Sequence, residues 1–184
     1  MIHIETERLL LRDWIATDLN VFREMNADRE VMAYFPNTLT NEETDRFYHA
    51  IQREWQTEGY GLYAVEVKHT HRFVGFIGFH KATFEADFTP CVEIGWRLAK
   101  AAWGQGYATE GASACLEHGF RHLGLHEVYS FTSKINQPSI HVMEKIGLQN
   151  LKEFNHPKLS PTSKLSRHVL YHIAKSDYKY PVTY

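Results

Sequence analysis

The chain has 184 residues, 43% of them hydrophobic, and a formal net charge of −2 with its histidines neutral. This composition is typical of one globular domain with a sizeable core, and it excludes a disordered chain. The chain lacks the basic excess of a nucleic-acid-binding domain, and no apolar run approaches the roughly 20 residues of a membrane span. We therefore expect one domain over residues 1–184, with neither nucleic acid nor a membrane as its partner.

The cysteines and the N-terminal segment bear on the compartment. Cys91 and Cys115 form neither a disulfide framework nor a zinc pattern. Residues 1–8 are too charged for a signal peptide, so we expect a cytoplasmic location. The histidine pairs spaced four residues apart are His118 with His122 and His168 with His172. No His-Glu-x-x-His motif accompanies them, so we expect no metal site.

The first 90 residues predict short strands and helices in alternation. Thr40-Asn41-Glu42-Glu43 is a capping box that starts a helix, and Gly59 stands where a helix-ending glycine is expected. A turn around residues 69–71 separates two strand patterns and predicts an antiparallel hairpin. The expected elements are a strand at 9–12, helices at 17–26, 29–35 and 40–58, strands at 60–67 and 73–80, and a loop at 81–90.

The middle of the chain predicts a strand, a glycine turn and a helix in direct succession. Residues 91–98 alternate in the manner of a strand, and Gly104 and Gly106 follow. Apolar residues then recur at helical spacing from Ala108 to Phe120. The first N–H groups of a helix lack intrahelical partners and lie at the positive end of its dipole. Because glycines let the backbone approach a phosphate closely, this turn predicts an anion site.

The last third of the chain repeats the alternation of strand and helix. Asn136 opens a helix, and Pro138 suits its first turn. The expected elements are a strand at 127–132, a helix at 136–147, a strand at 148–154, a polar loop at 155–166 and a strand at 168–174. Antiparallel strands followed by β-α-β-α-β predict a mixed α/β sheet.

Two phosphate-binding motifs compete for the glycine turn. A P-loop is excluded because no Gly-x-x-x-x-Gly-Lys-Ser/Thr occurs. The dinucleotide fingerprint fits in part, since Gly104 and Gly106 follow a strand and Glu127 lies about 20 residues further on. However, Thr109 occupies the place of its third glycine, and antiparallel strands precede the turn. A nucleotide-dependent oxidoreductase therefore stays as a minor alternative.

Several stretches resemble, in order and separation, the GCN5-related N-acetyltransferases (GNAT), in the branch of the ribosomal-protein N-terminal acetyltransferases. They are IETERLLLR at 4–12, VEIGW at 92–96, WGQGYATE at 103–110, NQPSI at 136–140, EKIGL at 144–148 and RHVLY at 167–171. The resemblance covers nearly the whole chain. It implies an α/β (α+β) single-domain GNAT fold, with a mixed, mostly antiparallel sheet of about six or seven strands flanked by helices.

The resemblance also implies that acetyl-CoA is the co-substrate. The main chain of Ile94 and Trp96 would pair with the pantetheine arm, and Asn136 would bond to it unless it serves only as a helix cap. The residues expected to hold the pyrophosphate are Gly104, Gln105, Gly106, Tyr107, Ala108 and Thr109. The family's usual Arg or Gln three residues before the first glycine is Ala101 here. We expect the side chains of Trp96 and Trp103 to pack in the core.

Transfer of an acetyl group to an amine needs a base, because amines are protonated at neutral pH. By resemblance Glu93 is the candidate base, although a strand carboxylate can also simply face solvent. Met143 stands where many members carry a tyrosine as the acid. The resemblance to the ribosomal-protein branch, which can use a serine three residues after the asparagine, makes Ser139 the candidate that protonates the departing thiolate. Ser139 could instead bond to its own helix backbone, or no protein acid is used.

The acceptor is poorly encoded in the sequence. The resemblance places it between Glu30, Tyr34 and Phe35 on one side and the loop 155–166 on the other. His156 could reach this pocket, but we expect it to be solvated. Aromatic rings with an acid suit a cation, either a protein N-terminus or a small-molecule amine. We expect the amine to attack the thioester directly. Members of the family often form dimers, so a homodimer is compatible with the resemblance. The rival hypothesis is a non-catalytic sensor or subunit that binds acetyl-CoA.

Overall fold

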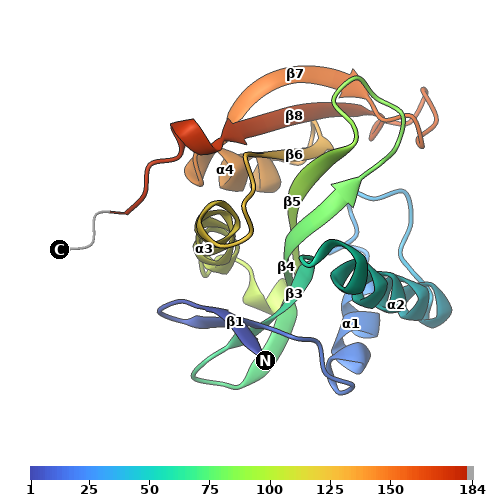
Figure 1. The fold of residues 1–184 in the computed structure, drawn as a ribbon. Coiled ribbons are helices and arrows are strands. Elements are labelled where there is room, and N and C mark those ends of the chain that lie inside the picture. Colours follow the sequence, from blue (N-terminus) through green and yellow to red (C-terminus); the bar gives the residue numbers. More distant parts are fainter. Residues whose placement is uncertain (182–184) are drawn as a thin grey trace.

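The computed structural model describes residues 1–181 as one eight-stranded sheet with helices on both faces (Figure 1). The strands are β1 (Ile2–Glu5), β2 (Leu9–Arg12), β3 (Leu62–Val67), β4 (Arg72–Ala82), β5 (Cys91–Leu98), β6 (Glu127–Ser133), β7 (Gln149–Asn155) and β8 (Arg167–Ala174). The helices are α1 (Asp18–Ala27), α2 (Asn41–Glu58), α3 (Tyr107–Arg121) and α4 (Gln137–Lys145). The expected mixed α/β architecture is confirmed, with one strand more than the six or seven expected.

The additional strand is β1, which pairs antiparallel with β2 at one edge of the sheet. It has four residues, of which Ile4 is buried. A strand this short and this exposed carries almost no hydrophobic alternation, which is the main signal for a strand in a sequence. Its existence depends on pairing with β2 rather than on its own pattern.

The sheet runs in the order β1-β2-β3-β4-β5-β6-β8-β7, and its neighbours are antiparallel except for β5 and β6. The predicted hairpin is confirmed as β3 and β4. β5 pairs with β4 along its whole length, but in the described chain it pairs with β6 at a single position, Glu93 opposite Tyr129. β5 and β6 therefore separate beyond Glu93, and one edge of β5 has no strand partner there.

The helices cover the two faces of the sheet as two separate layers (Figure 1). α1 and α2 lie on one face over a core rich in aromatic side chains, including Phe22, Tyr48 and Phe76. α3 and α4 lie on the other face over a larger core that includes Leu116 and Phe120. The central strand β5 is thus enclosed between the layers, and both can supply groups to its open edge.

Local capping explains where α2 begins and ends. The Thr40 hydroxyl accepts a hydrogen bond from the Glu43 N–H, and the Glu43 carboxylate accepts one from the Thr40 N–H, which confirms the capping box. Gly59 ends the helix in the left-handed conformation, with φ of 73°. Each cap satisfies backbone groups that the helix itself leaves unpaired.

The expected helix at 29–35 is wrong, because this segment folds as a series of turns. The Asp28 carboxylate accepts a hydrogen bond from the Glu30 N–H at 2.8 Å, and this side-chain acceptor competes with the helical pattern. The segment leads into Phe35 and Pro36 on the rim of a cavity. Among residues 1–181, no helix combines the length and the apolar composition that crossing a membrane requires.

Candidate active site

A cavity of about 930 Å³ opens where β5 and β6 separate. One wall is the turn and first residues of α3, and a second wall is formed by β6 and α4. The third wall is the segment 30–36 that connects α1 with α2. Its lining includes Glu93, Trp96, Gly104, Gly106, Tyr107, Ala108, Thr109, Asn136 and Ser139, so the structure brings together most of the residues proposed from the sequence.

The glycine turn leads into α3 as expected, and its backbone faces the cavity. Gly104 and Gly106 have φ of 71° and 79°, a conformation that glycine adopts without strain. A Cβ at Gly104 would meet nothing within 4 Å, so this glycine is needed for its backbone angle rather than for space. The first N–H groups of α3 are unpaired within the helix. The turn therefore has the geometry of an anion site.

Arg8 holds this turn from outside. Its Nη1 donates to the Gln105 carbonyl at 2.8 Å, and its Nε donates to the Glu110 carboxylate at 2.6 Å. Its guanidinium also lies over the Tyr107 ring. Gln105 itself does not line the cavity. Arg8 belongs to the N-terminal stretch that carried the resemblance, but no local pattern indicated that it would contact the turn.

The open edge of β5 presents main-chain groups between the two helical layers. Trp96 lines the cavity and packs against the core under α3, as expected. Ile94 is fully buried, and its carbonyl accepts a hydrogen bond from the Ser130 hydroxyl at 2.8 Å. The core position expected for Trp103 is wrong, because this side chain is 45% exposed and its indole N–H donates to the Leu98 carbonyl.

Glu93 lies on β5 directly opposite His80 of β4 and lines the cavity. Burial raises the pKa of Glu93 to about 8; the nearby charge of Glu54 adds to this rise and that of His80 opposes it. The ring of His80 lies 2.9 Å from the Glu54 carboxylate, and this hydrogen bond raises the pKa of His80. Glu93 can therefore exchange a proton near neutral pH, unlike a solvent-facing carboxylate.

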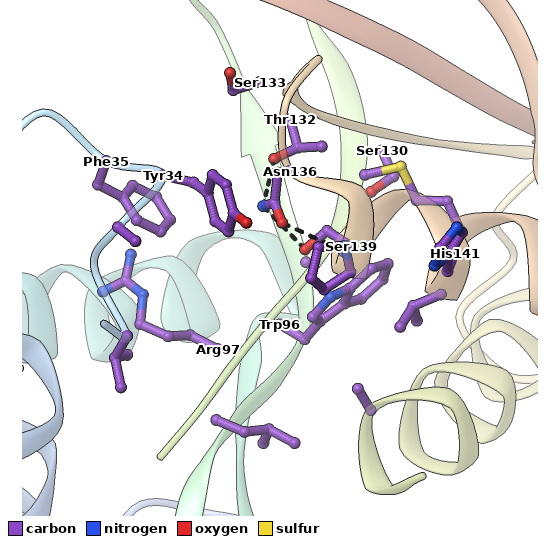
Figure 2. A pocket seen from close by; sticks show the side chains of 18 of the residues that line it. Tyr34, Phe35, Trp96, Arg97, Ser130, Thr132, Ser133, Asn136, Ser139 and His141 are labelled. Carbon is purple, nitrogen blue, oxygen red and sulfur yellow. Dashed lines mark hydrogen bonds between the residues drawn. The ribbon is translucent and has the colours of Figure 1, made fainter. Parts of the chain in front are cut away.

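Asn136 and Ser139 form one hydrogen-bonded unit at the start of α4 (Figure 2). The Asn136 side chain caps the helix by accepting from the Ser139 N–H at 3.4 Å. Its Nδ2 donates to the Thr132 hydroxyl at 2.9 Å and to the Ser139 hydroxyl at 3.2 Å. Because the Ser139 oxygen accepts a hydrogen bond, its own proton stays available for another acceptor. Met143, 2% exposed, also lines the cavity and has no proton to donate.

The opposite side of the cavity is formed by segments far apart in the sequence. Tyr34 and Phe35 come from one side in Figure 2, and Asn136 and Ser139 from the other. Glu30 lines the cavity as expected, but it is exposed and paired with Lys100. The expectation that His156 is solvated is wrong, because its ring lines the cavity and packs on other aromatic side chains. This burial lowers the pKa of His156.

Arg97 is a cavity residue that sequence reasoning missed. It follows Trp96 on β5, and its side chain extends toward Phe35 (Figure 2). Burial lowers the pKa of Arg97 to about 10, which leaves it charged at neutral pH. An arginine at the end of a strand usually reaches solvent, so its position in the sequence carries no signal that it is buried.

The histidine pairs do not assemble into a larger polar cluster. The His118 and His122 rings lie 5.1 Å apart, centre to centre, on α3. Within residues 1–181, no group of three His, Cys, Asp or Glu side chains lies close enough together to hold a metal ion.

Comparison with known proteins places this site in a family. Residues 8–149 match the acetyltransferase (GNAT) domain. The uncharacterized N-acetyltransferase YnaD of Bacillus subtilis (strain 168) is 32% identical over 147 residues, which cover 80% of this chain and 82% of that protein.

Solved structures give the same result. The GNAT-family acetyltransferase from Bacillus anthracis matches with a TM-score of 0.79 and 30% identity, over 96% of this chain and 99% of that chain. The spermidine N-acetyltransferase from Vibrio cholerae, in complex with CoA and spermine, shares the fold with a TM-score of 0.75, at 18% identity over 94% of this chain and 99% of that chain. The chain belongs to the GNAT family of N-acetyltransferases, as its motifs led us to expect.

Proposed function

We propose that this enzyme transfers the acetyl group of acetyl-CoA to a primary amine by direct attack within a ternary complex. The observation that supports the proposal is that one cavity brings together a carboxyl group with a raised pKa, an open strand edge, the start of a helix and a serine hydroxyl. The acceptor is a protein N-terminus or a small molecule. The cytoplasmic location and the formation of a homodimer remain predictions from the sequence.

Main-chain groups hold acetyl-CoA in this proposal. The backbone of residues 104–109 binds the pyrophosphate at the start of α3, with the Thr109 hydroxyl beside it. The pantetheine arm continues along the open edge of β5, where the Trp96 main chain polarises the thioester carbonyl. Ile94 is also expected to pair with the arm through its main chain, although its carbonyl already accepts a hydrogen bond from Ser130. Asn136 places Ser139 and keeps one lone pair for the arm.

Glu93 takes a proton from the ammonium group of the acceptor, directly or through water. A free amine then attacks the thioester carbon, so that a C–N bond forms and the C–S bond breaks. A carboxyl group with a pKa of about 8 is a stronger base than an ordinary glutamate, which suits an ammonium group with a pKa near 10. The placement of Glu93 at the point where β5 and β6 separate supports this role.

Ser139 donates its proton to the CoA thiolate as that group leaves. The hydrogen bond from Asn136 to the Ser139 oxygen supports this direction of transfer, because it leaves the hydroxyl proton free. An acetyl-enzyme on cysteine fits the site poorly. Cys115 is fully buried in the core, and burial raises the pKa of the Cys91 thiol to about 12.

The test is a thermal-shift assay with acetyl-CoA, CoA and NAD, together with thiol release over a panel of amines. A ligand present at about 100 times its dissociation constant stabilises by about 2.7 kcal/mol, which is measurable. We expect stabilisation by acetyl-CoA and amine-dependent thiol release. Stabilisation without release on any amine would support the non-catalytic sensor instead, and stabilisation by NAD alone would support the oxidoreductase.

A further inference from the structure

Arg97 is a partly buried cation in the wall of the cavity, and within residues 1–181 it has no carboxylate partner. Its side chain is only partly exposed to solvent, and it forms no ion pair with any carboxylate of residues 1–181. Its Nη1 donates to the Asn26 side-chain oxygen at 2.7 Å, whereas its buried Nε reaches no hydrogen-bond acceptor in the described chain. Buried charges in proteins are normally paired and hydrogen-bonded, so this one calls for an explanation.

Aromatic rings replace the missing carboxylate only in part. The guanidinium carbon lies 4.3 Å from the centre of the Phe35 ring, with Phe76 at 5.3 Å and Phe47 at 5.6 Å. Ring faces attract a cation, but by less than a carboxylate held at hydrogen-bond distance. Glu30, the acid of the segment 30–36, is already paired with Lys100. The Arg97 guanidinium therefore keeps its capacity for an anion that enters the cavity.

Resting on the proposed function, we propose that the acetyl acceptor is a primary amine that also carries a carboxylate, and that Arg97 binds this carboxylate. The guanidinium fork suits a carboxylate oxygen pair. A polyamine, which has no anionic group, would place a second cation beside Arg97 and be a poor acceptor. The acceptor class is thus closer to an amino acid than to a polyamine.

The floor of the cavity connects Arg97 with the reacting end. Glu93, Gly95 and Arg97 alternate along β5 and so share one face of the sheet. A Cβ at Gly95 would lie 3.8 Å from the Glu93 carboxyl group and meet nothing else within 4 Å, so open space lies between the base and the cation. The two Cα atoms are roughly 13 Å apart at the usual rise of a strand. An amine at Glu93 and a carboxylate at Arg97 can occupy this strip together.

The experiment compares acceptors that differ only in the carboxylate. The ω-amino acids from 3-aminopropanoate to 6-aminohexanoate are paired with n-alkylamines of matched length, and aminoalkylphosphonates test a phosphate-like anion. We expect wild-type kcat/KM to be at least about tenfold higher on the best amino acid than on its matched amine, as for a charged hydrogen bond. Arg97→Gln should remove this preference by lowering kcat/KM about 10- to 100-fold on amino acids alone.

Three controls separate anion binding from a structural role. Arg46→Gln makes the same charge change at an exposed position of α2 and should leave the preference intact. Arg97→Lys should restore part of it, and the KM for acetyl-CoA should stay within about twofold of wild type in every variant. An equal loss of kcat/KM on amines and on amino acids in Arg97→Gln would overturn the proposal. A wild-type enzyme that shows no preference for amino acids would also overturn it, and this second comparison does not depend on the folding of any variant. Preference for the phosphonates over the carboxylates would overturn the choice of anion.

Failure of the proposed function is distinguishable from failure of this inference. Butyrate, which has no amine, is titrated into the enzyme in the presence of CoA, and calorimetry measures its binding. Butyrate binding that Arg97→Gln abolishes, without acetylation of any amine, would support the anion site and contradict the acetylation chemistry. Acetylation of amines with no binding of butyrate or amino acids would leave the chemistry standing and overturn the role of Arg97.

Discussion

In the proposed function, the donor side and the acceptor side of the cavity recognise their ligands with different parts of the chain. On the donor side, the turn at 104–106, the start of α3 and the edge of β5 present main-chain groups within about 20 consecutive residues. On the acceptor side, Tyr34, Arg97 and His156 present side chains from three distant segments. A main-chain site leaves a local pattern in the sequence, since only certain residues permit its backbone. A side-chain site assembled by folding leaves no local pattern, and here Tyr34 was expected only through the family resemblance.

Glu93 stands where the two sides meet, and its substitution should have the largest effect. Glu93→Gln keeps the size of the side chain but removes the base, so kcat should fall by about 100-fold or more, with acetyl-CoA affinity unchanged. Because burial raises the pKa of Glu93 to about 8, wild-type kcat/KM should rise with pH until about pH 8 and then level off. Steady-state rates across pH, with acetyl-CoA binding measured in parallel, check both statements.

Stability provides a control on the same residue. The folded protein holds the Glu93 proton more tightly than the unfolded chain, whose ordinary pKa is 4.5, so stability should fall as pH rises from there to about 8. Glu93→Gln removes this penalty, and its melting temperature should exceed that of wild type more at about pH 9 than at about pH 5. An activity within about threefold of wild type would contradict the role of Glu93 as base.

Particular elements show which features the sequence could predict. The capping box of α2, the hairpin of β3 and β4, and the strand–turn–helix of β5 and α3 depend on local chemistry, and all were predicted within a few residues. β1, the turns at 29–35 and the burial of His156 depend on partners far along the chain and were missed. Arg97 belongs to this second class, because only the fold reveals that its Nε has no hydrogen-bond acceptor among residues 1–181.

Ser139 should have the next largest effect. Ser139→Ala removes the proton donor to the leaving thiolate, and because a thiolate is a good leaving group we expect kcat to fall by only about tenfold. Asn136 still caps α4 through the backbone N–H of residue 139, so the fold should be retained. Rates with acetyl-CoA saturating check this. A loss in acetyl-CoA affinity with unchanged kcat would instead assign the serine to binding.

The glycine turn tests the donor side through its backbone. Gly106 has φ of 79°, and a Cβ there would come within 3.4 Å of Arg8. Gly106→Ala therefore strains the turn by about 1 kcal/mol, and acetyl-CoA affinity should fall about fivefold if the turn relaxes away from its binding conformation. Calorimetric titration with acetyl-CoA measures this. Unchanged affinity would mean that the backbone of the turn does not contact the pyrophosphate.

The smallest effect is expected at Gln105, which lies between the two glycines. Its side chain does not line the cavity, and its carbonyl is held by Arg8, an interaction that alanine preserves. If the donor side binds through main-chain groups, Gln105→Ala should leave the KM for acetyl-CoA within about twofold of wild type. A large rise in KM would show that the Gln105 side chain turns inward when the ligand binds. The donor side would then depend on a side chain, as the acceptor side does, and the distinction between main-chain and side-chain recognition would not hold at the glycine turn.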